Sequence, residues 1–521
     1  REMRIDLRFQ TIFSFLFLVG LGFPVWWKTT NVYRAELPHS QILHLSSSND
    51  FQFKLDIVFL SKNQNFPWQN LDKKITTNNI SISFQFKSLP ESLINSKQTV
   101  AETDDILATT ASHVDNSGFV FFILDTQHGQ KEQIVLGKYR HGWIRKNLET
   151  VSEEQLVRLL NELIQVLEER IFFVNQRDSE TQPTLRSSTE YSVCFSLVNS
   201  DMSNILHISW EIEGAIGEYL QPVFSKLSTI ARFHVGSQVI NYGNFLKSPR
   251  WDKNQQVFVI DSRQLHHIIN PLEWQLESSD ISTRPLINFA ALVPALNNTP
   301  LFIKQEDGNL SPSNGFTIPQ WGGVSILNLN TTVVTIPHRV TLSVKDLEYI
   351  MKTFISQLRT LLGIPSNTMT NKSKVEVLTV PSPSGIADWE LDILIWKNLR
   401  YNLHNSISTL QSLSRLVQSL PNMVVQDHIR QLVDEAFLDL TKALKLVSSR
   451  DYITAFSFSQ SAVDKSEKAF FDSNMISLLY FPDEHKYAVY ALPFAPMIFQ
   501  LLSGLFNELK YRKTRQRTNP Q

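Results

Sequence analysis

The feature that most constrains this chain is an uncharged, largely apolar segment near its carboxyl end, residues 487–507. About 20 apolar residues, rising ~1.5 Å each in a helix, cross a hydrocarbon layer of about 30 Å. Pro493 and Pro496 lie inside the segment and predict a kink, which a bilayer tolerates where neighbouring groups satisfy the freed carbonyls. A buried core helix is the alternative, but such helices seldom run this long without charge. We therefore expect a transmembrane helix at residues 487–507.

A second uncharged segment lies at the other end of the chain, at residues 9–27. Phe, Leu and Val dominate it, and Trp26-Trp27-Lys28 supplies the aromatic and basic side chains that favour a headgroup interface. A cleavable signal peptide is the alternative, but such peptides end in small residues, whereas the bulky Phe23-Pro24 stands here. We expect an uncleaved signal anchor, in which residues 1–8 are cytosolic and a first transmembrane helix follows.

Basic residues set the expected orientation of the two helices. The carboxyl-terminal tail, residues 508–521, carries a cluster of Lys and Arg, and such clusters favour the cytosolic side of a membrane. With two spans, both termini are cytosolic, and residues 28–486 lie in the lumen. This segment contains N-x-S/T sequons, which predict glycosylation at Asn79, Asn297, Asn330 and Asn371. Another sequon, at Asn309, is a poorer candidate because Pro312 follows its Ser311.

Composition narrows the class of protein. The net charge of −1 gives no reason to expect nucleic acid as a partner, and 42% hydrophobic with 19% charged residues suits a folded chain with membrane segments. Cys194 is the single cysteine, so no disulfide within the chain is possible.

The first part of the luminal segment, residues 28–387, has the pattern of an α/β domain, a mixed sheet layered with helices. Short apolar runs predict strands at 54–60, 81–87, 119–124, 190–198, 257–260, 286–293, 323–329 and 333–344. Amphipathic runs predict helices at 152–167, at 210–227, and from Ser343, with Asp346 as its capping partner, to Gly363. Residues 88–117 are polar and poorly periodic, which predicts a long loop. A polar linker at 177–188 is a candidate boundary between two units of this domain.

The second part, residues 388–486, is predicted to be helical and to stand next to the membrane. Segments 388–420, 427–448 and 451–468 contain almost no glycine, and their apolar residues recur every three or four positions. Short connections make neighbouring helices antiparallel, as in a helical hairpin or a three-helix unit. Periodicity does not separate a packed stalk from a docking surface.

Residues that carry chemistry are scarce. Cys194 lies in a strand pattern that favours a small buried hydrophobe over a nucleophile. His266-His267 would point to opposite faces of a strand, and no partner follows at metal-ligand spacing. The carboxylate pairs are expected on the solvated surface: Asp104-Asp105, Glu153-Glu154 and Glu168-Glu169. His485 beside Asp483 and Glu484 is read as the polar start of a helix at the membrane interface. We expect no catalytic residue, no cofactor and no metal.

Several pieces of the sequence, in order along nearly the whole chain, resemble the phosphatidylinositol-glycan class S (PIG-S) family. The pieces are Leu21-Gly22-Phe23-Pro24-Val25-Trp26-Trp27-Lys28-Thr29-Thr30, Tyr33-Arg34-Ala35, Leu37-Pro38, Trp210-Glu211-Ile212-Glu213-Gly214-Ala215, Ile269-Asn270-Pro271, Pro319-Gln320-Trp321-Gly322-Gly323, Trp389-Glu390-Leu391-Asp392, Ala469-Phe470-Phe471-Asp472 and residues 478–486. The regions 49–117 and 363–383 diverge, so the resemblance implies nothing about them. Phe23-Pro24 stands where the family usually has Leu-Pro, a conservative departure.

The resemblance implies a non-catalytic, structural subunit of the glycosylphosphatidylinositol (GPI) transamidase of the endoplasmic reticulum membrane. That complex removes a carboxyl-terminal signal from a precursor protein and joins the new carboxyl end to a GPI lipid. In the family, the nucleophilic cysteine belongs to the PIG-K subunit, and the other implied partners are PIG-T, PIG-U and an aminopeptidase-like GPI-attachment subunit. Membrane lipid and GPI itself are further expected contacts. The alternatives are a membrane-anchored luminal hydrolase or transferase, and a luminal receptor for precursor signal peptides.

Overall fold

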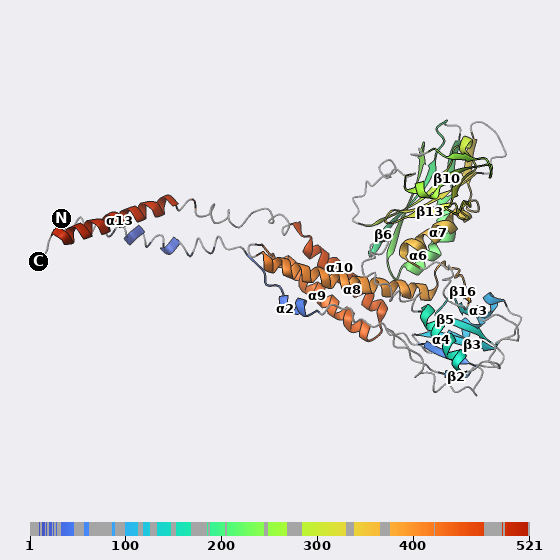
Figure 1. Ribbon diagram of the computed structural model, residues 1–521, viewed down its shortest axis with the longest axis horizontal. Coiled ribbons are helices and arrows are strands. Elements are labelled where there is room, and N and C mark those ends of the chain that lie inside the picture. Colours follow the sequence, from blue (N-terminus) through green and yellow to red (C-terminus); the bar gives the residue numbers. More distant parts are fainter. Residues whose placement is uncertain are drawn as a thin grey trace. The chain divides into compact units, whose positions relative to one another are not determined.

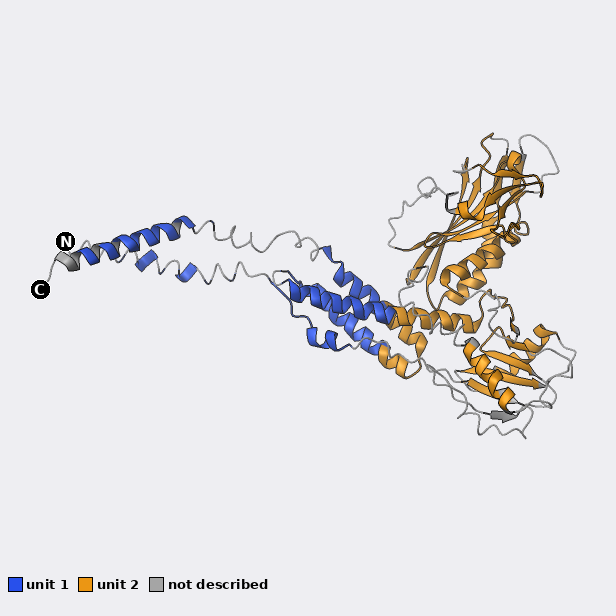
Figure 2. Ribbon diagram, in the orientation of Figure 1, with its two compact units in different colours: residues 1–49, 402–443, 461–521 blue, residues 50–401, 444–460 orange. Residues whose placement is uncertain are grey.

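The computed structural model describes most of the chain outside its amino-terminal region and several connections. The described residues are scattered positions between 10 and 28, then 33–45, 57–61, 86–88, 99–112, 118–125, 133–146, 153–167, 185, 188–203, 206–243, 248–267, 284–329, 338–364, 376–420, 423–473, 492 and 495–518. They form two compact units (Figure 2). Unit 1 comprises residues 1–49, 402–443 and 461–521, and unit 2 comprises residues 50–401 and 444–460.

Unit 2 contains a six-stranded sheet in the order β16-β4-β5-β3-β1-β2. Its strands are β1 (Ile57–Ser61), β2 (Phe86–Ser88), β3 (Phe119–Asp125), β4 (Gln133–Leu136), β5 (His141–Lys146) and β16 (Glu376–Thr379). Strand β4 runs antiparallel to β5, and the other pairs are parallel. The prediction of a strand buried on both faces at 119–124 is confirmed, because successive side chains of β3, Phe121 and Phe122, are both 0% exposed.

Helix α3 (Val100–Ser112) contradicts the predicted loop at 88–117. A reciprocal cap begins the helix: the Glu102 amide donates to Thr99 Oγ1 at 3.3 Å, and the Thr99 amide donates to Glu102 Oε2 at 3.0 Å. The segment looked aperiodic because the helix presents little apolar surface, with Leu107 as its fully buried hydrophobic residue. Helix α4 (Glu153–Leu167) agrees with its prediction and buries Leu159, Leu160 and Leu163.

Unit 2 also contains a five-stranded sheet in the order β13-β14-β11-β6-β8. Its strands are β6 (Glu190–Asn199), β8 (Arg232–Asn241), β11 (Leu286–Val293), β13 (Gly315–Ile318) and β14 (Gly322–Ile326). Strand β13 is antiparallel to β14, and the other strands are parallel. The predictions at 190–198 and 286–293 are confirmed, whereas β8 and β13 were not predicted.

Helices cover one face of this sheet. They are α5 (Ile212–Ala215), the π-helical turn η4 (Ile216–Leu220), α6 (Gln221–Leu227) and α7 (Glu348–Leu362). Figure 1 shows α6 and α7 beside the strands of this sheet. Helix α7 packs Phe354 against Phe195 and Phe289, with ring centroids 5.8 and 5.2 Å apart, and α6 stacks Phe224 on Phe233 at 4.9 Å. The predicted ends of α7 are confirmed: Ser343 and Asp346 exchange hydrogen bonds, and Gly363 adopts a left-handed conformation at φ 76°.

A three-stranded sheet, in the order β12-β10-β9, packs against the other face. Its strands are β9 (Arg250–Asp252), β10 (Val257–Asp261) and β12 (Leu301–Lys304), and a separate parallel pair joins β7 (Leu206–Trp210) to β15 (His338–Leu342). The layer between the two sheets contains Val198, Ala290, Leu292, Ile260 and Ile303.

The predicted helices at 388–420, 427–448 and 451–468 are confirmed as α8 (Asp388–Ser419), α9 (Asp427–Ser448) and α10 (Tyr452–Phe470). In unit 1 they pack with a segment from the start of the chain, residues 33–45, which includes the short helix α2 (His39–His44). Ile42 of this segment is 1% exposed in the same core as Leu410 and Val433. The amino-terminal segment is thus part of the helical unit.

Unit 1 ends with helix α13 (Ala495–Thr518). Across the described part of the chain, no helix is both long enough and apolar enough to span a bilayer. The predicted span at 9–27 is described only at scattered positions, and the predicted span at 487–507 is described at 492 and from 495 onward.

Candidate functional site at the start of helix α8

Several hydrogen bonds and ion pairs meet at the first turn of α8, which carries one of the sequence pieces that resemble the PIG-S family. The indole nitrogen of Trp389, which is 2% exposed, donates to the carbonyl of Gly137 at 2.9 Å. The Asp388 amide donates to the carbonyl of Lys138 at 3.1 Å. Two groups of α8 therefore bind the turn between β4 and β5.

Ion pairs extend this attachment on both sides. Arg140, in the same turn, reaches Asp392 with two hydrogen bonds, Nε to Oδ2 at 2.6 Å and Nη2 to Oδ1 at 2.8 Å. The hydrogen bond to Asp392 raises the pKa of the Arg140 guanidinium. On the other side, Lys226 of α6 donates to Asp388. Carboxylates suit the amino-terminal turn of α8, because the helix dipole is positive there.

Glu390 connects α8 to α7. Arg359 donates from Nη1 to Glu390 Oε2 at 2.9 Å and from Nη2 to Oε1 at 2.6 Å, and the Glu390 side chain is 5% exposed. Glu390 Oε2 also accepts from the Ala387 amide at 2.9 Å, and Arg359 Nη1 donates to the carbonyl of Gly385. The two hydrogen bonds from Arg359, which is half-buried, and the bond from the Ala387 amide compensate for the burial of the Glu390 charge.

A buried carboxylate–imidazole pair supports the β4–β5 turn. Asp104 of α3 lies 2.9 Å from His141 of β5, Oδ1 to Nε2, and both side chains are 0% exposed. The prediction that Asp104-Asp105 is solvated is therefore wrong for Asp104, because α3 directs it into the core; Asp105 is 67% exposed. Gly137 passes so close to this pair that an added Cβ would lie 2.4 Å from His141 Nε2 and 2.5 Å from Asp104 Oδ1.

The arrangement is a structural junction. Carboxylates of α8 each have a cationic or amide partner on a different element, and Asp104 and His141 bind each other away from solvent. These groups hold the β4–β5 turn, α6 and α7 against the start of one helix. Arg140, His141, Lys226 and Arg359 were not expected from the sequence. The basic run Lys138-Tyr139-Arg140-His141 marks the first two, and no sequence pattern marks Lys226 or Arg359.

Cys194 lies in β6 and is partly buried. Its sulfur accepts a hydrogen bond from Gln238 Nε2 at 3.1 Å, and Ser196 Oγ lies 3.8 Å away. Burial raises the pKa of the thiol, although the bonds from Ser196 and Gln238 offset part of this effect. At neutral pH the group is a thiol, which is a poor nucleophile.

Other candidate residues are placed as follows. His266 and His267 lie in the 3₁₀ helix η5 (Ser262–His267), so the strand geometry assumed for them does not apply; the predicted strand at 257–260 is β10, which ends at Asp261. Within the ranges that the structure describes, no group of three or more His, Cys, Asp or Glu side chains is placed to hold a metal ion. Glu154 is exposed at the start of α4, which also contains Glu153.

Two sequon asparagines are visible. Asn297 is exposed in the short 3₁₀ helix η6 (Leu296–Asn298), and Asn309 is exposed and donates to Asp307 at 2.9 Å. Further candidates lie outside the described residues: Asn79, Asn330, Asn371, Glu168, Glu169 and His485.

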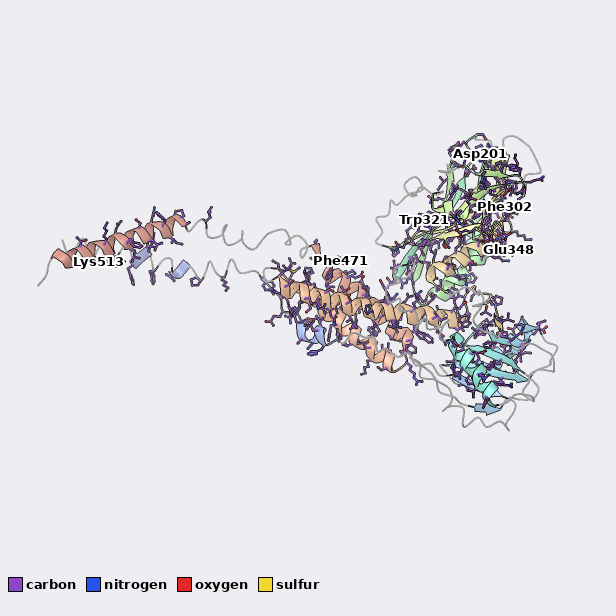
Figure 3. The ribbon with its side chains drawn as sticks, in the orientation of Figure 1. Asp201, Phe302, Trp321, Glu348, Phe471 and Lys513 are labelled. Atoms are coloured by element: carbon purple, nitrogen blue, oxygen red, sulfur yellow. The ribbon has the colours of Figure 1, made fainter. Side chains whose placement is uncertain are left out.

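Other pieces of the sequence resemblance also occupy contacts between elements. Trp321, labelled in Figure 3, lies between β13 and β14, and Gly322 and Gly323 begin β14. A Cβ at Gly322 would lie 1.8 Å from the carbonyl oxygen of Asn288. A Cβ at Gly323 would lie 2.1 Å from Gln357 Oε1 of α7, whose Nε2 donates to the Val324 carbonyl at 2.7 Å. These glycines let α7 and β11 approach the strand closely.

The same is true in unit 1. Asp472 Oδ2, after the end of α10, accepts from His428 Nε2 of α9 at 2.8 Å, and Tyr33 donates to Asp427 Oδ1 at 2.7 Å. Phe471 is 64% exposed next to this contact (Figure 3). Several residues in the sequence pieces that resemble the family therefore make contacts between helices and strands.

Comparisons with known proteins agree with the resemblance. The sequence model of the family described as phosphatidylinositol-glycan biosynthesis class S protein matches residues 13–515. The GPI-anchor transamidase component PIGS of Bos taurus is 31% identical over 538 residues, which cover 97% of this chain and 94% of the relative. The human protein of the same name is 30% identical over 94% of this chain and 92% of its own length. The GPI transamidase component PIG-S homolog of Schizosaccharomyces pombe is 27% identical over 97% of this chain and 84% of its own length.

Proposed function

The chain belongs to the phosphatidylinositol-glycan biosynthesis class S family, and from this premise we propose that it is a structural component of a GPI transamidase. The observation that carries the proposal is the extent of the match, since relatives named as transamidase components align with nearly the whole chain. In this proposal the chain is needed for transfer of a preassembled GPI anchor to the carboxyl end of precursor proteins, and its contribution is architectural.

The state of Cys194 and of the ion pairs around α8 supports a role without catalysis. Cys194 is partly buried and its thiol pKa is raised, and the buried charges around α8 are paired across elements. The proposal therefore assigns the catalytic cysteine to another subunit, PIG-K, with PIG-T, PIG-U and an aminopeptidase-like GPI-attachment subunit as further partners. By holding such partners in place, a scaffold lowers the entropic cost of bringing a lipid amine to a peptide carbonyl.

The proposal places the chain in the endoplasmic reticulum membrane, with spans at 9–27 and 487–507, both termini in the cytosol and the α/β and helical parts in the lumen. Support comes from α13, whose apolar side chains Ile498, Phe499 and Phe506 are 51%, 76% and 72% exposed. Lipid would solvate such side chains better than water. Lys510 and Lys513 follow them in the same helix, as expected for its cytosolic end. Figure 3 labels Lys513.

Purification tests membership of the complex. The full-length chain, carrying an affinity tag, is purified in mild detergent from cells that lack the native protein, and co-purifying proteins are identified by mass spectrometry. We expect PIG-K and the other transamidase subunits in the purified fraction. Recovery of the folded chain without any of them would contradict the proposal. Luminal placement is tested in the same material by digestion with an endoglycosidase, which should increase mobility on a gel for the wild type and less for Asn297→Gln.

A further inference from the structure

Strand β8 is the outermost strand of the five-stranded sheet, and its one neighbour in that sheet is β6. The two strands pair in parallel over their full length, from Glu190 opposite Arg232 to Asn199 opposite Asn241. Among the described residues, no strand pairs with the other edge of β8.

The pairing pattern shows which backbone groups are left at that edge. The Arg232 amide donates to the Thr189 carbonyl at 2.9 Å, so Arg232 and every second residue after it direct their N–H and C=O groups toward β6. The intervening residues direct theirs away from the sheet. These residues are Phe233, Val235, Ser237, Val239 and Asn241. Their amides and carbonyls form a regular row that matches the spacing of another strand.

Side chains along β8 are also unusually exposed for a strand. Val235 is 40% and Val239 is 42% exposed, on the face of the sheet that the helices cover elsewhere. Gly236 has no heavy atom within 4 Å of where its Cβ would lie. Soluble proteins protect an edge of this length with Lys, Pro, a bulge or a covering loop. From Phe233 to Asn241, β8 contains no Lys or Pro, and its register with β6 is unbroken.

We propose that an extended segment of another transamidase subunit adds to the outer edge of β8 as a further strand of this sheet. The inference rests on the proposed function, since it assumes that the chain works inside a complex. Strand addition satisfies the row of backbone groups, and alternate side chains of the added strand then provide specificity.

The two faces of β8 define the chemistry of the partner segment. Beside Val235 and Val239 the added strand should carry apolar side chains, which would cover both valines. The opposite face presents His234 and Gln238, and Arg232 is exposed at the beginning of the strand. His234 already lies 3.4 Å from Glu190, which Arg284 also binds at 2.7 Å. A segment with alternating apolar and polar residues, and a carboxylate near Arg232, fits this edge.

A resident subunit fits the edge better than a precursor protein. A precursor leaves after each reaction and would expose an unprotected edge between turnovers, with the risk of aggregation that such edges carry. A subunit that stays bound keeps it covered.

Ser237→Pro tests the pairing directly. Proline removes the outward amide of residue 237 and blocks a neighbouring strand, whereas the amides that bind β6 remain. Gly236 precedes the site, so proline meets no side chain there. The matched control is Ser237→Thr, which keeps the amide. We expect about tenfold less of one transamidase subunit to co-purify with the proline variant, and an unchanged amount with the threonine variant.

A second variant and a folding measurement separate pairing from misfolding. Val239→Lys places a charge on the exposed face without touching the backbone, with Val239→Thr as its control. Both test variants should keep the wild-type melting temperature and resistance to limited proteolysis. If both fold normally and recover every subunit at the wild-type level, the inference is wrong.

Crosslinking identifies the occupant. A photoreactive phenylalanine analogue in place of Val239, in the full-length chain in cells, should link to a defined segment of another transamidase subunit. A link to a second copy of this chain, to another part of the same chain, or to a precursor protein would overturn the inference. If the wild type recovers no transamidase subunit, the proposed function fails; if it recovers them but position 239 links to none, only this inference fails.

Discussion

Arg359 and Glu390 form a two-pronged ion pair between α7 and α8, with N–O distances of 2.9 and 2.6 Å and a Glu390 side chain that is 5% exposed. Removing one partner leaves the other charge poorly compensated, whereas the pair itself contributes less than that loss. We expect Glu390→Gln to lower the free energy of unfolding by about 3 kcal/mol. Denaturant titration of the purified chain measures the change.

The exposed pair Glu348–Lys352, within α7, is the control for this prediction. Its N–O distance is 2.6 Å, but its side chains are 48% and 66% exposed, so water screens the interaction. Glu348→Gln should leave the unfolding transition unchanged. Equal effects of Glu390→Gln and Glu348→Gln would contradict the view that the start of α8 is a buried junction.

Gly137 should not tolerate a side chain. A Cβ at this position would lie 2.4 Å from His141 Nε2, in the core beside Asp104. We expect Gly137→Ala to destabilise the protein by about 2 kcal/mol, because the buried pair must move apart or the β4–β5 turn must shift. Gly217→Ala is the matched substitution, since no heavy atom lies within 4 Å of its Cβ position. The melting temperature of Gly137→Ala should be clearly lower than that of Gly217→Ala. Equal melting temperatures would show that Gly137 does not pack closely against Asp104 and His141.

The amino-terminal segment should contribute to the stability of unit 1. Ile42 is 1% exposed among residues of α8 and α9, whereas the adjacent Leu43 is 44% exposed. We expect Ile42→Ala to cost about 3 kcal/mol and Leu43→Ala to be close to neutral. Denaturant titration again provides the measurement. A neutral Ile42→Ala would indicate that residues 33–45 are not part of the helical core.

The single cysteine makes Cys194 an easily measured probe. Burial raises the pKa of its thiol in the folded chain, so the thiolate forms at higher pH than in the unfolded chain. Alkylation by iodoacetamide at pH 8 should therefore be slower in the folded than in the denatured protein. The protonated thiol also contributes to the free energy of unfolding. This contribution is fully present below the ordinary thiol pKa and is lost as the pH rises through the raised pKa of the folded state. A folded-state rate equal to or above the denatured-state rate would indicate an activated cysteine.

The spacing of apolar residues predicted the helices and strands that are buried on one face or on both faces. Helices α8, α9 and α10 and strands β3 and β11 have continuous apolar patterns, and the structure places them where the sequence does. Strand β8 escaped prediction because it is exposed along most of its length and shows no regular alternation of buried positions. Helix α3 escaped because its core-facing side includes polar residues, Thr103 and Asp104.

The junction at α8 could not be predicted, for a different reason. Arg140 and Asp392 are 252 positions apart, and Asp104 and His141 are 37 apart. In the sequence, each of these polar or charged residues is expected on the solvated surface. Only the fold brings the oppositely charged side chains together. Trp389-Glu390-Leu391-Asp392 was identified by its resemblance to a family and not by any pattern of its own.

We propose that this chain supports GPI attachment without contributing a catalytic group. The most direct measurement is surface display of a GPI-anchored reporter in cells that lack the protein and receive either the wild type or Cys194→Ala. We predict that both restore the reporter equally, at equal expression. Restoration by the wild type but not by a folded Cys194→Ala would contradict the claim and indicate an enzyme.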